Sequence, residues 1–233
     1  MSIRAFVFAA PLFLVVAAAQ TQVPVTGLCN TGLTKASLEP QGCLSSTLVT
    51  PVNPDSGGPS VDGNWFLATP YPSTYNAPPP NPCQLPTYGS AWVDAAWSAW
   101  YNPDDGRSQY ISPEVLGPYA GAGWFIYATT LPIPPAPAGS TGYTLTVDGQ
   151  ALVDNNLAGI VLQDPLGSTS NCHGVAPPSS AGYSAWTPFT FAAPVIPNTH
   201  AALYFVTYNQ PCNGCENPTA LRVEFTSAWF TPK

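Results

Sequence analysis

Charged residues are scarce in this 233-residue chain, where they make up 7% of the sequence. Long helices and coiled coils depend on Glu, Lys and Arg, so this scarcity excludes a coiled coil or a charged helical bundle. Basic residues are the rarest, with five Lys and Arg against twelve Asp and Glu. Because phosphate binding needs clustered Lys and Arg, we expect no nucleic-acid partner.

Catalytic signatures are equally sparse. The only histidines are His173 and His200, and the sequence has no nucleophile elbow, no His-Glu-x-x-His motif and no phosphate-binding glycine loop. A glycosidase needs only two carboxylates, and Asp104, Asp105 and Glu114 are available. Nothing distinguishes these three from the other acids, so we expect a protein that is not an enzyme, with a hydrolase as a minor alternative.

Proline and glycine, in contrast, are abundant, with 29 and 19 residues respectively. A proline in a helix interior costs about 3 kcal/mol, so long helices are not expected. The chain is nevertheless 45% hydrophobic and 12% aromatic, which is enough apolar surface to form a core and argues against disorder. The composition therefore predicts one compact all-β or loop-rich domain.

Residues 1–19 have the pattern of a secretory signal peptide. Arg4 precedes an apolar run from Ala5 to Ala19 that ends in an Ala-x-Ala cleavage motif. The run contains Pro11 and is shorter than the roughly 20 residues that span a bilayer. We expect cleavage after Ala19, no transmembrane segment after signal cleavage, and a secreted or extracellular protein.

Six cysteines remain after this cleavage, and an even number in an exported chain predicts disulfides. The predicted pairs are Cys29–Cys43 and Cys212–Cys215, which are close in sequence, and Cys83–Cys172, which is what remains. A zinc site is the alternative, with Cys212 and Cys215 joined by Cys172 and His173 as further ligands. The exported context favours the disulfides.

Residues 20–58 are rich in Thr, Ser, Gly and Pro and show little hydrophobic periodicity. We interpret them as a disulfide-stapled N-terminal extension with one or two short strands at most. Residues 59–233 contain eight runs with strand chemistry. These runs are Asn64–Thr69, Ala91–Ala96, Gly123–Ile133, Tyr143–Val147, Gly159–Gln163, Trp186–Ala192, Ala201–Asn209 and Ala220–Phe230.

Apolar and polar residues alternate in several of these runs, as in Tyr143–Val147, which indicates strands with one buried and one solvated face. Prolines concentrate between the runs, for example in residues 78–80 and 132–137. The Asp148-Gly149 pair is typical of a hairpin turn between two short strands. We therefore predict an all-β fold, a β-sandwich or jelly roll of about eight antiparallel strands with long Pro-rich loops.

Four motifs follow one another along the second part of the chain. They are Gly63-Asn64-Trp65, Ser108-Gln109-Tyr110-Ile111-Ser112-Pro113, Val153-Asp154-Asn155 and Asn217-Pro218-Thr219-Ala220-Leu221-Arg222-Val223-Glu224-Phe225. In this order they resemble a group of exported bacterial proteins of the sorting-signal type, whose single domain is similar to the galactose-binding-like jelly roll of carbohydrate-binding modules. The resemblance implies that residues 59–233 form a galactose-binding-like β-sandwich.

An aromatic segment followed by polar residues is the most unusual stretch. It contains Trp92, Trp97, Trp100 and Tyr101, and Asn102, Asp104, Asp105 and Arg107 come directly after it. Sugar rings stack their C–H faces on flat aromatic side chains, and their hydroxyls need paired donors and acceptors. We expect the first two tryptophans to pack in the core and the next two aromatics to be exposed. The predicted ligand-binding residues are Trp100, Tyr101, Asn102, Asp104 and Arg107.

A structural calcium ion is a possible cofactor, and no other is expected. Related jelly rolls often hold calcium between an early loop and the last strand, and the resemblance thereby makes Asp62 and Glu224 candidate ligands. Asp104-Asp105-Gly106 also resembles a fragment of a calcium loop. Alternatively, Glu224 is a solvated strand residue or the partner of Arg222 or Arg107.

Two functions are consistent with these observations. The first is a secreted, non-catalytic carbohydrate-binding protein whose partner is a glycan or a cell-envelope surface. The alternative is a structural or adhesive component of the cell envelope or of an extracellular assembly. The low charge supports the alternative, since few charged side chains keep such surfaces apart.

Overall fold

The computed structural model describes residues 21–32, 60–69, 78–84, 87–94, 100–101, 107–113, 121–175, 182–213 and 218–233. The predicted signal peptide and most of the N-terminal extension lie outside these residues. No helix in the described part of the chain is long and apolar enough to cross a membrane.

The regular secondary structure of the described residues is β-strand, apart from one 3-10 turn of three residues. The elements are β1 Val23–Pro24, β2 Ser60–Thr69, η1 Pro82–Gln84, β3 Thr87–Asp94, β4 Tyr110–Ser112, β5 Gly123–Ile133, β6 Tyr143–Asp154, β7 Asn156–Gln163, β8 Cys172–Val175, β9 Thr187–Val195, β10 Thr199–Asn209 and β11 Ala220–Pro232. The prediction of an all-β fold is confirmed. The eight predicted runs correspond to the eight longest strands, and the three additional strands are only two to four residues long.

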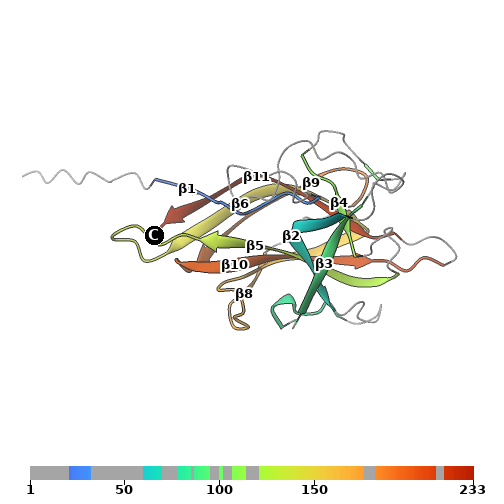
Figure 1. Ribbon diagram of the computed structural model, residues 1–233, viewed down its shortest axis with the longest axis horizontal. Coiled ribbons are helices and arrows are strands. Elements are labelled where there is room, and N and C mark those ends of the chain that lie inside the picture. The colour runs from blue at the N-terminus through green and yellow to red at the C-terminus, as the bar shows by residue number, and fades with distance from the viewer. Residues whose placement is uncertain are drawn as a thin grey trace, which may run out of the picture.

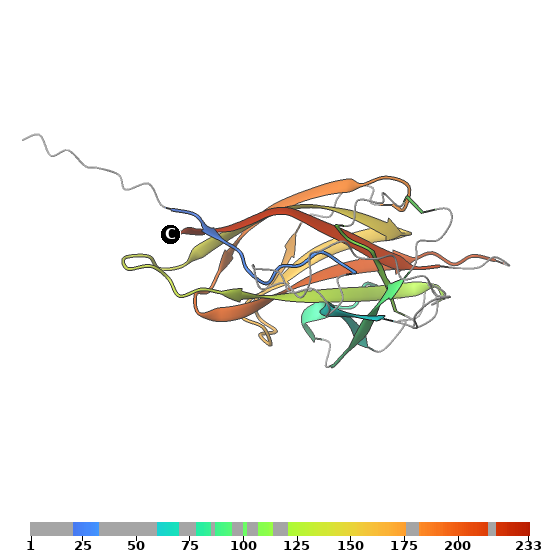
Figure 2. The same ribbon diagram turned by 45° about the horizontal axis from the view of Figure 1, so that its top comes forward.

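The strands form two layers that are joined along one side (Figures 1 and 2). The order of hydrogen-bonded neighbours is β8-β7-β10-β5-β2-β3-β4-β11-β6-β9, and β1 pairs with β11. All of these pairings are antiparallel. One layer consists of β9, β6 and β11, the other of β5, β10 and β7, and β2 to β4 connect them.

The core lies between the layers and is built largely from every second residue of the longer strands. In β6 the buried members include Leu145, Val147 and Val153. Trp65 of β2 is completely buried there, and its ring lies 5.3 Å from that of Phe205. This alternation was the basis for predicting the strands, because a sheet face packed on a core selects apolar residues with period two.

The prediction of a turn at Asp148-Gly149 is wrong, because β6 runs through both residues. A side chain at Gly149 would place its Cβ 2.7 Å from the backbone oxygen of Glu224. The neighbouring strand β11 has an irregular register at this point, between Phe225 and Ser227. The glycine is therefore needed for close approach of two strands and not for a turn.

Residues 21–32 of the predicted extension pack against the sandwich. β1 pairs with Trp229 and Phe230 of β11, and it runs beside this strand in Figure 1. The indole N–H of Trp65 donates to the backbone oxygen of Cys29 at 3.0 Å. Thr31 donates its backbone N–H to Val223 at 3.1 Å. This part of the extension thus belongs to the folded body.

The disulfide predicted between Cys83 and Cys172 is present and joins residues 89 positions apart. Cys29 and Cys212 are also disulfide-bonded, and their predicted partners, Cys43 and Cys215, lie outside the described residues. The zinc alternative is wrong, because a sulfur in a disulfide is not available as a thiolate ligand. Cys172 and Cys212 are both oxidised in this way.

Candidate functional site

On the outer face of β6 and β11, the side chains change from partly exposed to buried partway along the strands. From Tyr143 to Gln150 the burial of β6 alternates, but its last four residues, Ala151 to Asp154, are all buried. A second, small cluster covers the strands there and contains Trp100, Tyr110, Leu152, Ala220 and Trp186. We call the five aromatic residues Trp100, Tyr101, Tyr110, Tyr183 and Trp186 the aromatic cover.

Trp100 attaches the cover to the sheet. Its side chain is buried, and the indole N–H donates to Oδ2 of Asp154 at 2.9 Å. The ring centroid lies 4.6 Å from that of Tyr110. The hydroxyl of Tyr110 donates to the backbone oxygen of Tyr101 at 2.8 Å. The backbone that carries Tyr101 is therefore held by two buried aromatic residues.

Tyr101 and Tyr183 are the exposed members of the cover. Their backbones are joined by a hydrogen bond in which the N–H of Tyr101 donates to the oxygen of Tyr183 at 2.8 Å. The side chains are 45% and 39% exposed, respectively. The N–H of Val153 in β6 donates to the backbone oxygen of Gly182 at 3.2 Å. Two separate segments, each carrying an exposed tyrosine, are thus joined to each other, and one of them is joined to β6.

A buried ion pair lies beneath the cover. The guanidinium of Arg222 is 3.8 Å from Oε1 of Glu224, and both side chains are almost inaccessible to solvent. Nε of Arg222 donates to the hydroxyl of Ser108 at 2.7 Å, and this hydroxyl donates to Oε1 of Glu224 at 2.8 Å. Gln150 donates to Oε2 of Glu224 at 2.8 Å. These bonds satisfy charges that burial would otherwise make very costly.

Arg222 also stacks on two rings of the cover. Its guanidinium carbon lies 5.2 Å from the ring centroid of Trp186 and 5.8 Å from that of Tyr110. Cation–π contacts at such distances are attractive, and they gain strength when the cation is desolvated. The cation therefore fixes the orientation of two aromatic residues in addition to pairing with Glu224.

Burial changes the acid–base properties of this region. Desolvation raises the pKa of Tyr110 far above its ordinary value, with the nearby charge of Arg222 opposing the shift. Desolvation also raises the pKa of Asp154, and hydrogen bonds from Trp100 and Asn155 oppose that shift. Tyr110 is therefore a neutral hydrogen-bond donor at all physiological pH values.

The predicted ligand-binding residues differ in their exposure to solvent. Trp100 is only 5% exposed, so the expectation that it is exposed is wrong: its indole is used to bind Asp154. Tyr101 is exposed as expected. Arg107 is exposed too, and its backbone oxygen accepts from Nδ2 of Asn30 at 3.2 Å. Asn102 and Asp104 lie outside the described residues.

Of the two tryptophans expected in the core, Trp92 is half-buried on β3, and Trp97 lies outside the described residues. Sequence reasoning overlooked Tyr183, Trp186 and Arg222 as members of the site. The available signal was a pair of aromatic residues just before a strand, at positions 183 and 186.

Asp62 and Glu224, the candidate calcium ligands, are both buried and bonded to protein donors. Oδ2 of Asp62 accepts from the N–H of Gly32 at 2.6 Å, and Oδ1 accepts from that of Asn64 at 2.8 Å. Glu224 pairs with Arg222, which confirms one alternative for this residue. No group of three or more metal-ligating side chains occurs in the part of the chain that the structure describes. The calcium site stays a prediction.

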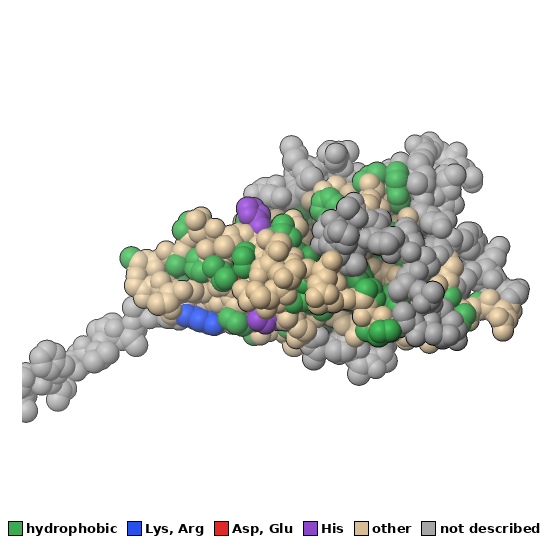
Figure 3. Space-filling model, turned by 90° about the horizontal axis from the view of Figure 1, so that it is seen from below, with side chains coloured by type: hydrophobic (Ala, Val, Ile, Leu, Met, Phe, Trp, Pro, Cys, Tyr) green, Lys and Arg blue, Asp and Glu red, His purple; other side chains and the backbone are tan. Residues whose placement is uncertain are grey.

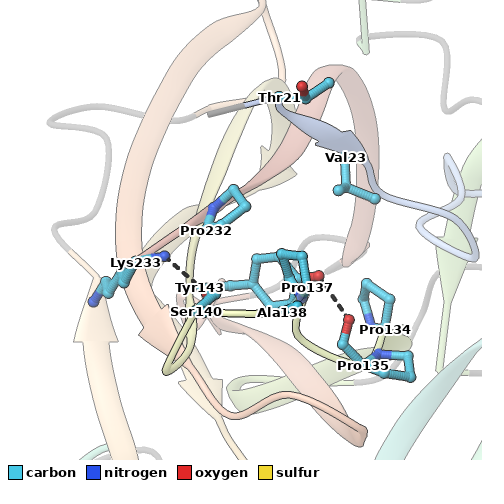
Figure 4. Close-up of a pocket in the computed structure, with 11 residues that line it drawn as sticks. Thr21, Val23, Pro134, Pro135, Pro137, Ala138, Ser140, Tyr143, Pro232 and Lys233 are labelled. Carbon is cyan, nitrogen blue, oxygen red and sulfur yellow. Dashed lines mark hydrogen bonds between the residues drawn. The ribbon is translucent and has the colours of Figure 1, made fainter. Parts of the chain in front are cut away.

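A cavity of about 580 Å³ lies at the other end of β6 (Figure 4). Its walls come from β1, the β5–β6 connection and the end of β11, and they include Val23, Pro134, Tyr143 and Lys233. The hydroxyl of Tyr143 donates to the backbone oxygen of Pro135 at 2.9 Å. None of the predicted site residues lines this cavity.

The outer face of the opposite layer is covered differently. Cys83 in η1 and Cys172 in β8 are joined over a cluster that includes Ile126, Tyr204 and Val206. The hydroxyl of Tyr204 donates to Gln163 at 2.7 Å. Seen from below in Figure 3, the described side chains are mainly apolar or uncharged, and no Asp or Glu is visible. This cover contains no buried ion pair among the described residues.

Compared with known proteins, the sequence matches no protein-family model and no curated protein.

Proposed function

We propose that this protein binds carbohydrate without catalysis, through the exposed tyrosines of the aromatic cover. The observation that carries the proposal is the backbone hydrogen bond between Tyr101 and Tyr183, which joins the backbones of two exposed aromatic residues. Aromatic faces stack on the apolar C–H faces of sugar rings. Because the base beneath them is buried and hydrogen-bonded, little conformational entropy is lost on binding.

Arg107, which was predicted as a ligand-binding residue, is the candidate polar partner in this proposal. Arg107 is exposed and directly precedes Ser108, whose hydroxyl contacts Arg222 and Glu224. A guanidinium is a donor of several hydrogen bonds in fixed directions, which suits vicinal sugar hydroxyls. The proposal thus combines stacking on the tyrosines with hydrogen bonds from Arg107.

A glycan array tests the proposal. We expect the purified protein to bind a defined set of neutral glycans and the Tyr101→Ala/Tyr183→Ala variant to lose roughly tenfold or more in affinity, which is about 1.4 kcal/mol. Phe66→Ala is the matched control, because Phe66 is 39% exposed on β2 and lies outside the cover. Absence of binding, or equal binding by the double variant, would contradict the proposal.

We further infer that the protein is secreted. The disulfide between Cys83 and Cys172 is suited to an oxidising compartment, and residues 1–19 have the composition of a signal peptide. Mass spectrometry of the exported protein should find Gln20 as the first residue. Protein that stays inside the cell and retains Arg4 would contradict this inference.

The alternative of a structural assembly receives less support. β9 pairs only with β6 among the described strands, so none of these strands pairs with its other edge. Pro188 and Pro194 lie in this edge strand, and proline cannot donate to an added strand. We expect light scattering to show a monomer at high concentration. A mass that rises with concentration would favour assembly.

A further inference from the structure

The open half of the outer face of the β9–β6–β11 layer carries a strip of hydroxyl-bearing side chains. Its position follows from the register, in which Thr146 pairs with Trp229, and Asp148 pairs with both Ser227 and Thr190. All of these residues point away from the core and are half-buried or exposed. We call Thr144, Thr146, Asp148, Thr190, Ser227, Trp229 and Thr231 the hydroxyl strip.

The strip begins where the aromatic cover ends. Leu152 lies beneath the cover, whereas Gln150, the next outward residue of β6, is half-buried and donates to Glu224 of the buried ion pair. From Leu152 back to Thr144 the strand advances eight residues, 152 minus 144, which at about 3.4 Å each is roughly 27 Å. Cover and strip together thus form a continuous surface that is long enough for several linked sugar rings.

Asp148 is the only charged residue in the strip and is fixed by two of its neighbours. Thr190 donates to its Oδ1, and Ser227 donates to its Oδ2 at 2.7 Å. These bonds lower the pKa of Asp148, so the carboxylate is ionised at neutral pH. A carboxylate has about four acceptor sites, which leaves capacity for hydroxyl donors of a ligand.

Trp229 gives the strip a stacking surface. It is half-buried in β11, between Thr146 of β6 and Pro24 of β1 in the sheet. An indole ring that is flanked by hydroxyls reproduces, at a second position, the mixture of apolar face and polar partners that a sugar ring needs. An acidic glycan would be repelled by the ionised Asp148, so these side chains favour a neutral one.

From this continuity we infer that the aromatic cover and the hydroxyl strip form one extended site for a neutral polysaccharide chain. One sugar unit stacks on the tyrosines of the cover, and the following units lie along β6 and β11 over Asp148 and Trp229. The inference rests on the proposed function and adds to it the length and charge of the ligand.

Calorimetric titration with two series, β-1,4-galactooligosaccharides and cello-oligosaccharides of two and six units, tests this inference. We expect the hexasaccharide of at least one series to bind about tenfold more tightly than its disaccharide, or about 1.4 kcal/mol. Trp229→Ala and Asp148→Asn should each weaken hexasaccharide binding several-fold and leave disaccharide binding unchanged. Because disaccharide binding is retained only by a folded site, it also reports that each variant is folded.

Trp124→Ala and Thr130→Val are the matched controls, since both residues are half-buried on β5 in the opposite layer. They should bind both lengths like the original protein. Equal affinity for the two lengths, or an equal effect of Trp229→Ala on both, overturns the extended site and leaves the proposed function intact. If neither series binds, the extended site is contradicted for these glycans. The glycan array then decides independently whether the proposed function holds.

Discussion

The two layers of the sandwich cover their outer faces with different chemistry. Over β5, β10 and β7 the cover is apolar and is closed by the disulfide between Cys83 and Cys172. Over the end of β6 and the beginning of β11 it is aromatic and polar, and it surrounds the buried pair of Arg222 and Glu224. Among the described residues, the first cover thus protects a sheet without a buried ion pair.

This comparison gives a reason for the buried ion pair beneath the aromatic cover. A buried ion pair often contributes little more stability than well-packed apolar residues would. Arg222 instead orients two rings, and Trp100 holds the segment that carries Tyr101. We call the cover that is closed by Cys83 and Cys172 the disulfide cover, and we interpret it as a stabilising arrangement. We interpret the aromatic cover as the arrangement that positions the exposed tyrosines. Four predictions test this difference.

The largest effect is expected for Arg222→Met. This change leaves Glu224 buried without its cation, and breaking a buried pair in this way costs about 3–5 kcal/mol. Glycan binding should also fall, because Trp186 and Tyr110 lose the guanidinium against which they stack. Urea denaturation measures the free energy of unfolding, and titration measures the affinity.

The double variant Arg222→Met/Glu224→Gln is the control for this experiment, since it removes both charges. It should recover part of the lost stability without recovering full affinity. If affinity returns together with stability, the ion pair has only a structural role, and the two covers do not differ in the way we describe.

The second effect concerns the disulfide cover. Cys83→Ser/Cys172→Ser should lower the free energy of unfolding by roughly 2–5 kcal/mol, because the unfolded chain loses a long-range crosslink. Affinity for glycans should be unchanged, since the bond lies over the opposite layer. A loss of affinity in a variant that remains folded would show that the covers are coupled.

The third effect compares one hydrogen bond in each cover. Trp100→Phe removes the donor to Asp154, and Tyr204→Phe removes the donor to Gln163. Each leaves a buried acceptor with one partner fewer, so each should cost about 1–3 kcal/mol in urea denaturation. Only Trp100→Phe should reduce glycan affinity. Similar losses of affinity in both variants would contradict the comparison.

The smallest expected effect is a change in how the stability of the protein depends on pH. Burial raises the pKa of Asp154 in the folded protein above its usual value of 3.8, so the folded state binds more protons than the unfolded state between these two pKa values. Stability should therefore increase as the pH falls through this window, and Asp154→Asn should remove the increase.

Asp148 provides the control of opposite sign. Its folded-state pKa lies below 3.8, so its contribution is present above that pH and is lost as the pH falls through the folded pKa. Thermal melts between pH 7 and pH 3 measure both slopes. The same slope change in Asp148→Asn and Asp154→Asn would contradict the assigned environments.

The sequence was sufficient to predict the longer strands but not the site. Alternation in β6 identifies a strand locally, because period two reflects one buried face. At Asp148-Gly149 the local turn signal was misleading, since pairing with β9 and β11 on both sides keeps the strand extended. The short strands β1, β4 and β8 are defined mainly by their partners and have no periodicity to recognise.

The members of the site are brought together by long-range register, which composition does not reveal. Arg222 pairs with Leu152 across β11 and β6, and this pairing places its guanidinium below Trp186. The prediction that Trp100 is exposed was wrong for a related reason. Its buried partner, Asp154, lies 54 positions away in sequence, so no local pattern indicates the contact.

The most direct test of the account is to map the binding surface by NMR. Two-dimensional spectra of the labelled protein should be recorded during titration with a hexasaccharide that it binds. We predict shifts at Tyr101, Tyr183 and Trp186, and along β6 at Thr146 and Asp148. Shifts confined to the cavity of Figure 4 or to the disulfide cover would contradict the account.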